Sequence, residues 1–190
     1  RTYGQLDSAF GMHPCKVQLP GVECSTGSLG HGIGLAAGMA AWARQQGRGH
    51  RVFTLVGDGE SCEGSVWEAV IGARSLKLGN LVVFVDRNKQ FMTSMSEERI
   101  ILEPYADKWR AFGWNVIEID GHDMSQLVGA VDALPDAQSE LPTAVICHTV
   151  KGKGVDYMEG DIGWHAGSLN KSDLERTLES LRAGRKEAVK

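Results

Sequence analysis

The sequence contains no long hydrophobic run, no paired cysteine motif and no excess of basic residues. No apolar stretch approaches the roughly 20 residues that a membrane-spanning helix needs, and no signal-peptide pattern opens the chain. The four cysteines, at positions 15, 24, 62 and 147, form no CxxC pair, which argues against a zinc cluster or a thioredoxin-like motif. The net charge of −4 argues against nonspecific nucleic-acid binding. We therefore expect a cytoplasmic protein with reduced thiols.

What the sequence does have is an ordinary globular composition with an unusual distribution of glycine. Hydrophobic residues make up 42% of the 190 residues and charged residues 23%, which is sufficient for one domain with a real core. The 24 glycines include groups at positions 27–38, 57–64 and 152–154. Such groups mark turns at which the backbone approaches another group closely.

The pattern of apolar residues predicts an α/β fold. We expect strands at 51–56, 81–85, 114–119 and 143–148, and helices at 28–44, 65–78, 104–112, 123–134 and 169–188. Strands that alternate with helices predict a parallel sheet with helices on both faces. Residues 1–27 and 151–168 are expected to be loops, and the glycine-rich second loop follows a strand, as mobile functional loops often do. Residues 1–190 are expected to form a single domain.

Polar residues follow the predicted strands, where ligands bind in open parallel sheets. Gly57-Asp58-Gly59 follows the first strand, and Asn88 follows the second. Carboxylate and amide oxygens suit Mg²⁺, and glycine amides can hold phosphate groups. The two turns together predict a diphosphate–magnesium site. A similar turn at 120–122 is interpreted as the start of a helix.

These motifs resemble the thiamine-diphosphate motif, and the wider sequence is similar to the transketolase family, specifically to its diphosphate-binding half. The resemblance covers residues 13–181 and includes several strings in the family's order. It implies a thiamine-diphosphate-binding fold of the diphosphate type. It also implies a transferase that moves a two-carbon ketol unit from a ketose to an aldose with thiamine diphosphate and Mg²⁺ (or Ca²⁺ or Mn²⁺). The strings are His13-Pro14, residues 25–40, residues 57–69, residues 85–88, residues 149–154 and Trp164-His165.

The same resemblance implies roles for individual residues at the cofactor. Asp58, Asn88 and the backbone carbonyl of Gln90 would bind the metal ion. The amide of Gly59 would contact the diphosphate, and backbone groups of Leu29 would support the aminopyrimidine. The remaining cofactor contacts would come from Gly27, Lys151 and His165.

Three residues acquire catalytic roles through the resemblance: His13, His165 and Glu63. His13 would face the reactive carbon of the cofactor, and Glu63 would belong to an acid chain that links two active sites across an interface. Taken without the resemblance, His13 fits a surface turn, His165 fits packing beside Trp164, and Glu63 fits the first turn of a helix. His31 stands where relatives usually have glutamine.

The resemblance implies that two parts of the active site lie outside residues 1–190: a pyrimidine-binding domain, which in this family supplies an essential glutamate, and a family histidine upstream of residue 1. We therefore expect half of each active site in this chain. It would be either the N-terminal subunit of a split transketolase or a fragment of a longer chain, and we favour the subunit. Two copies and two partner chains would then form a heterotetramer that acts on sugars or sugar phosphates.

Other functions remain open at this stage. The α subunit of a 2-oxo acid dehydrogenase and a deoxyxylulose-phosphate synthase share the Gly-Asp-Gly and Asn motifs, but residues 63–69 and the Lys-Gly-Lys-Gly tail favour transketolase. A Rossmann nucleotide-binding module is disfavoured because Gly30-His31-Gly32 lacks the third glycine. A non-catalytic subunit that binds the cofactor is the alternative of another class.

Overall fold

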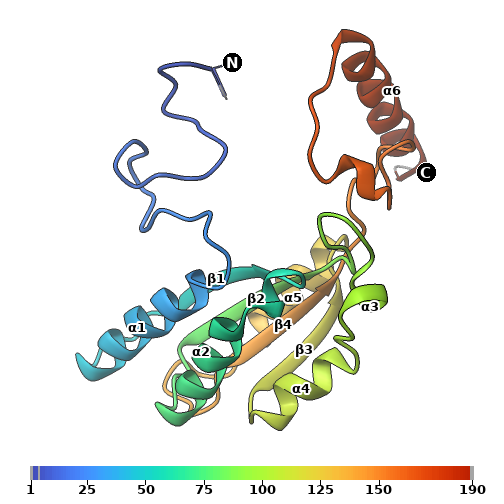
Figure 1. Ribbon diagram of the computed structural model, residues 1–190. Helices are drawn as coiled ribbons and strands as arrows, with labels where there is room; N and C mark the ends of the chain where they lie inside the picture. Colours follow the sequence, from blue (N-terminus) through green and yellow to red (C-terminus); the bar gives the residue numbers. More distant parts are fainter. Residues whose placement is uncertain (1, 4, 189–190) are drawn as a thin grey trace.

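The computed structural model describes residues 2–3 and 5–188. Its centre is a four-stranded sheet in the order β1-β2-β4-β3, in which every neighbouring pair is parallel (Figure 1). The predicted parallel sheet is therefore confirmed. The strands are β1 (Val52–Gly57), β2 (Leu81–Arg87), β3 (Asn115–Asp120) and β4 (Thr143–His148).

Helices separate the strands along the chain, as the periodicity predicts. Helix α1 begins four residues later than expected because Gly30 has a φ of +78°, which a right-handed helix does not allow. Helix α2 ends at Ser75, before Lys77 with its φ of +56°. The helices are α1 (Gly32–Gln45), α2 (Gly64–Ser75), α3 (Ser96–Arg99), α4 (Tyr105–Ala111), α5 (Met124–Asp132) and α6 (Lys171–Ala188), with short 3₁₀ turns at Glu60–Cys62 and Ile162–Trp164.

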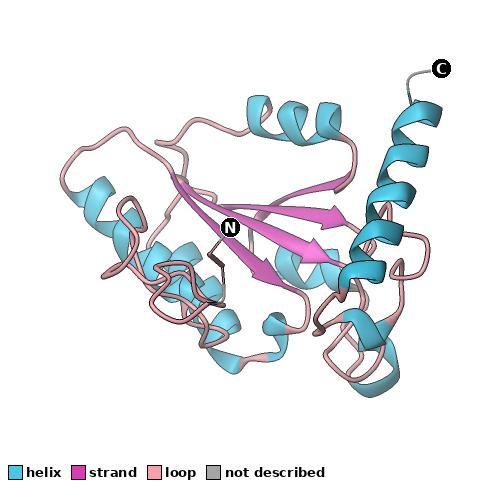
Figure 2. Cartoon of the chain, turned by 90° about the horizontal axis from the view of Figure 1, so that it is seen from above, coloured by secondary structure: helices cyan, strands magenta, loops and turns pink. Residues whose placement is uncertain are grey.

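Helices cover both faces of the sheet, as predicted (Figures 1 and 2). One face packs against α1, α2 and α4 in a core that includes Ile33, Val70 and Trp109. The other face packs against α5 in a smaller cluster that includes Val145 and Ala130. Because the strands are buried on both faces in the centre of the sheet, β2 and β4 are nearly continuous apolar runs.

The two ends of the chain lie outside these layers. Residues 2–27 form turns without helix or strand among those described, and they precede α1. The loop 151–168 and α6 follow β4, and Figure 1 shows both terminal segments rising on the same side of the sheet while standing apart from each other.

No described helix has the length and apolarity to cross a membrane. The thiols of all four cysteines are free, and only that of Cys147 is buried.

Candidate functional site

Asp58 lies at the carboxyl end of β1 with only 1% of its surface exposed. Its Oδ2 accepts hydrogen bonds from the amide of Lys89 at 2.6 Å and from Nη1 of Arg87 at 2.9 Å, and its Oδ1 accepts one from the amide of Gly59 at 2.7 Å. These contacts form because Gly57 on β1 is in register with Asp86 on β2, so the two strand ends meet. Burial raises the pKa of Asp58, and the bonds from Arg87 and the amides only partly offset that effect.

Asn88 and Gln90 belong to the turn that follows β2. Oδ1 of Asn88 accepts a hydrogen bond from the amide of Gln90 at 3.0 Å, and Lys89 between them has a left-handed φ of +60°. A Cβ atom placed on Gly59 would lie 3.7 Å from the carbonyl oxygen of Gln90. The structure therefore brings the three residues that the sequence assigns to the metal ion to the same corner of the sheet.

The oxygens at this corner fit a hard divalent cation. An ionised carboxylate has about four positions for donors, and Asp58 uses three of them. The side-chain oxygen Oε1 of Gln90 is buried and has no partner among the described residues. No group of three or more His, Cys, Asp or Glu side chains that could hold a metal ion occurs in the described part of the chain. The oxygens at this corner are those of one carboxylate, one side-chain amide and one backbone carbonyl. Such oxygen sets suit Mg²⁺.

Arg87 lies at this candidate site, and the sequence reasoning gave it no role. It is 1% exposed, and besides Asp58 it pairs with Glu97 at 2.6 Å and with Glu103 at 2.8 Å. Burial by itself would lower the pKa of Arg87, but its bonds to Glu103, Glu97 and Asp58 outweigh burial and raise that pKa above the ordinary value. The available signal was an arginine next to Asn88 at the end of a buried strand, where an unpaired cation would be costly.

His13 and Gly27 lie together in the segment before α1. The φ of Gly27 is +133°, and a Cβ atom on it would lie 3.0 Å from the ring of His13. The amide of Thr26 donates to the carbonyl of Pro14 at 3.2 Å, which holds the two stretches side by side. The structure thus brings the predicted catalytic histidine against a predicted cofactor-binding glycine. The side chain of Leu29 is exposed nearby in sequence, as is that of His31.

Glu60 joins the glycine turn before α1 to the end of β1. Its Oε1 accepts from the amide of Gly30 at 2.9 Å and its Oε2 from that of Gly57 at 3.1 Å. Glu63 packs beside the same turn, since a Cβ atom on Gly30 would lie 2.8 Å from its Cβ. The sequence reasoning assigned a role to Glu63 and overlooked Glu60, although both carboxylates follow the Gly-Asp-Gly motif.

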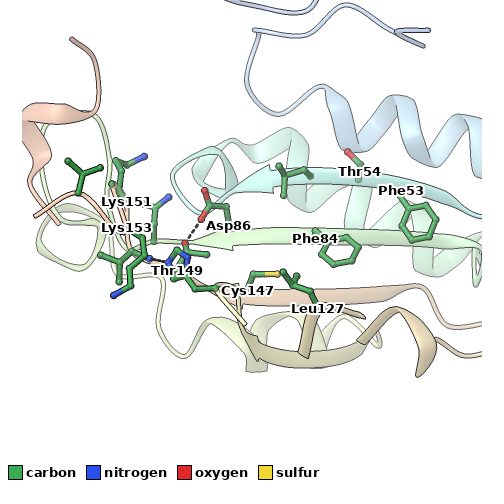
Figure 3. Close-up of a pocket in the computed structure, with 16 residues that line it drawn as sticks. Phe53, Thr54, Phe84, Asp86, Leu127, Cys147, Thr149, Lys151 and Lys153 are labelled. Atoms are coloured by element: carbon green, nitrogen blue, oxygen red, sulfur yellow. Dashed lines mark hydrogen bonds between the residues drawn. The ribbon is translucent and has the colours of Figure 1, made fainter. Parts of the chain in front are cut away.

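Lys151 is half-buried and lines a cavity of about 910 Å³ beyond the ends of β2 and β4 (Figure 3). Asn88 lines the same cavity, so the predicted diphosphate lysine and a predicted metal ligand share it. Thr149 donates a hydrogen bond to Asp86 at the cavity wall (Figure 3). Away from the strand ends, the cavity extends over the apolar sheet face at Phe53 and Phe84 and is also lined by Leu127 of α5.

The structure confirms the interpretation of residues 120–122 and leaves the predicted cofactor role of His165 a prediction. His165 is exposed, and its ring makes no hydrogen bond with any described residue, while Trp164 packs edge-on against Tyr157 with ring centres 5.3 Å apart. The interpretation of 120–122 as a helix start is confirmed, because Asp123 caps α5 through the amides of Ser125 and Gln126. His122 nevertheless lines the cavity and accepts a hydrogen bond from the amide of Val150 at 2.8 Å.

Comparisons with known proteins agree with this geometry. Residues 1–187 match the family described as the transketolase, thiamine diphosphate binding domain. The chain is 40% identical over 180 residues to an apulose-4-phosphate transketolase subunit of Phocaeicola vulgatus, a match that covers 95% of this chain and 63% of that protein. It is 41% identical over 145 residues to 6-deoxy-6-sulfo-D-fructose transketolase subunit SqwG of a Clostridium species, covering 76% of this chain and 52% of that protein.

A solved structure shows the same fold. The crystal structure of transketolase from Campylobacter jejuni superposes with a TM-score of 0.86 at 28% sequence identity, covering 95% of this chain and 29% of that one. The chain thus spans about half to two thirds of the two subunits and under a third of the larger enzyme. Sequence and fold lead to one assignment: this chain belongs to the transketolase family, in which it corresponds to the thiamine diphosphate binding domain.

Proposed function

We propose that this protein is the N-terminal subunit of a split transketolase, which binds thiamine diphosphate and Mg²⁺ and transfers a two-carbon ketol unit from a ketose to an aldose. The observation that carries the proposal is the convergence of Asp58, Asn88 and the Gln90 carbonyl at the ends of β1 and β2. Membership of the transketolase family supports this chemistry over that of other thiamine enzymes.

Each group of residues has a proposed task at the cofactor. Asp58, Asn88 and the Gln90 carbonyl hold the metal ion, while the amide of Gly59 and the side chain of Lys151 hold the diphosphate. When bound, thiamine diphosphate supplies the carbon nucleophile that takes up the two-carbon unit and passes it on. Gly27 and Leu29 orient the ring system through backbone groups, and His165 adds a further contact to the diphosphate.

Proton transfer suits histidine, because an imidazole ring can both take up and release a proton near neutral pH. His13 is held against Gly27 and is suited to exchange a proton with a sugar hydroxyl at an imidazole nitrogen. Glu63, beside the turn at Gly30, is proposed to connect this site with a second one across an interface. The cytoplasmic location stays a prediction.

The names of the relatives support a proposal for the partner and the substrate class. Two of these are called transketolase subunits, and their names specify a phosphorylated sugar in one case and a sulfonated sugar in the other. We therefore propose that a pyrimidine-domain chain completes each active site, in a heterotetramer, and that the substrate is a sugar with an anionic group at the end remote from the carbonyl.

Reconstitution tests the proposal. The full-length protein is titrated with thiamine diphosphate in the presence and absence of Mg²⁺ by calorimetry, and NAD serves as the control ligand. Activity is then measured with a ketose phosphate and a ketose sulfonate as donors and an aldose phosphate as acceptor, with and without the partner chain. We expect Mg²⁺-dependent binding, no transfer by this protein alone, and transfer once the partner chain is added.

Other outcomes identify what is wrong. Transfer by this protein alone would contradict the split active site. Decarboxylation of pyruvate in place of ketol transfer would favour the 2-oxo acid dehydrogenase or deoxyxylulose-phosphate synthase alternative. Cofactor binding without turnover, even with the partner chain present, would favour a non-catalytic subunit.

A further inference from the structure

The side chain of Gln90 reaches from the turn after β2 to a distant loop. It is 5% exposed, and its Nε2 donates a hydrogen bond to the carbonyl oxygen of Gly160 at 2.7 Å. The two residues are 70 positions apart in the sequence. This side-chain contact is separate from the backbone carbonyl of Gln90, which is the group assigned to the metal ion.

Gly160 in turn forms a backbone hydrogen bond with Lys151. The amide of Gly160 donates to the carbonyl oxygen of Lys151 at 2.9 Å, and its φ of +75° lets the chain fold back at this point. Gly152 has a φ of +77°, and a Cβ atom on it would lie 2.6 Å from the carbonyl oxygen of Met158, so the loop 151–160 is tightly closed. Two consecutive hydrogen bonds therefore connect the Gln90 amide to the backbone of Lys151.

The rest of the loop forms side-chain hydrogen bonds with α6 and not with the sheet. The hydroxyl of Tyr157 lies 2.6 Å from Oγ1 of Thr177, and the hydroxyl of Ser180 donates to Asp156 at 2.7 Å. Within the part of the chain that the structure describes, the bond from Gln90 to Gly160 is the one hydrogen bond between residues 152–184 and residues 2–149. It is therefore the polar connection between this loop unit and the turn after β2.

We propose that the Gln90 side chain is a positioning residue, which holds the loop 151–160 so that Lys151 faces the metal-binding turn. The inference rests on the proposed function, because the role of Lys151 toward the diphosphate belongs to it. One residue would thus couple the two halves of the cofactor site: its backbone carbonyl serves the cation, and its side-chain amide fixes the lysine that serves the anion.

The test uses Gln90→Met, which keeps the length of the side chain and the backbone carbonyl but removes the amide. The matched control is Gln138→Met, since Gln138 is exposed and its side chain makes no hydrogen bond with a described residue. Dissociation constants for thiamine diphosphate and for inorganic pyrophosphate are measured by calorimetry at saturating Mg²⁺. The proteins compared are the unsubstituted protein, Gln90→Met, Gln138→Met, Lys151→Met and the double variant that combines Gln90→Met with Lys151→Met. A lost hydrogen bond of about 1 kcal/mol corresponds to roughly fivefold weaker binding.

We expect Gln90→Met to weaken both ligands by about fivefold, Lys151→Met to weaken them further, and the double variant to bind as Lys151→Met does. A merely structural role would give additive losses, and that result, or unchanged binding in Gln90→Met, would overturn the proposal. Gln90→Leu repeats the test if Gln90→Met does not fold.

Hydrogen exchange without cofactor separates this proposal from the proposed function. If Gln90 tethers the loop, the amides of residues 151–160 exchange faster in Gln90→Met than in the unsubstituted protein and in Gln138→Met. Unchanged exchange would contradict the tether. If the unsubstituted protein does not bind thiamine diphosphate at all, the proposed function fails, while the exchange experiment still decides whether Gln90 holds the loop.

Discussion

Asp58 and Arg87 form an ion pair at the ends of two neighbouring strands, with Nη1 of Arg87 2.9 Å from Oδ2 of Asp58 and both side chains almost fully buried. The contact fixes the orientation of the carboxylate that we propose as a metal ligand. Arg87 also forms ion pairs with Glu97 and Glu103, which connect the segment around α3 to the end of β2. Loss of the arginine would leave three carboxylates without their common cation.

Replacement of Arg87 by methionine is expected to lower the free energy of unfolding by about 3–5 kcal/mol, because removing one partner of a buried pair leaves an uncompensated charge. Urea denaturation at neutral pH measures the change. The control is Arg110→Met, whose pairs with Asp107 and Glu118 are half exposed, so the expected loss is below about 1 kcal/mol. Equal losses in the two variants would show that the Arg87 network contributes no more than a surface pair.

The sequence was sufficient to predict the sheet and the corner at which the proposed metal ligands lie, because both depend on local patterns. Apolar runs of strand length mark β2 and β4. Because the carboxyl ends of parallel strands meet at one edge, the placement of Asp58 and Asn88 at the same edge can be predicted from their positions alone. The four-residue helix α3 has too few residues for any periodicity to appear, and it was missed.

The contacts of Arg87 and Glu60 depend on how distant segments fold together, and the sequence did not predict them. Arg87 binds carboxylates 10 and 16 residues farther along the chain, and Glu60 binds an amide 30 residues before it. No spacing rule selects Glu60 over Glu63 or pairs Arg87 with Glu103. The same holds for the contact of Gln90 with Gly160, which arises only in the folded chain.

Asp58→Asn is expected to weaken Mg²⁺-dependent binding of thiamine diphosphate by more than about 100-fold, because loss of a direct ligand should exceed the roughly 10- to 100-fold cost of losing an outer-shell partner. Calorimetry measures binding, and circular dichroism checks that the fold persists. Asp107→Asn is the control, since that carboxylate is 66% exposed on α4 and has no proposed role. Full cofactor affinity in Asp58→Asn would remove Asp58 from the metal site.

Gly30→Ala and Gly34→Ala are expected to change stability in opposite directions. Gly30 has a φ of +78°, and its Cβ would collide with Oγ of Ser65 and lie 2.8 Å from Cβ of Glu63, so we expect a loss of roughly 2–4 kcal/mol. Gly34 lies in α1 with nothing within 4 Å of an added Cβ, and alanine there should add about 0.5–1 kcal/mol. Urea denaturation of both variants checks the prediction, and a change of the same sign would contradict it.

Tyr105→Phe is expected to remove an alkaline dependence of stability. Tyr105 is 2% exposed, its hydroxyl lies 2.6 Å from Oγ of Ser61, and burial raises the pKa of Tyr105 to about 12. Because an unfolded tyrosine ionises near pH 10, the neutral phenol stabilises the fold fully below about pH 10, and this contribution is lost as the pH rises to about 12. The difference in unfolding free energy between the unsubstituted protein and Tyr105→Phe should therefore fall by up to roughly 2–3 kcal/mol across that pH range. The control is Tyr3→Phe, because Tyr3 is exposed, and its unfolding free energy should change with pH as that of the unsubstituted protein does. Denaturation curves that stay parallel for Tyr105→Phe and the unsubstituted protein would show that Tyr105 ionises equally in the folded and unfolded states.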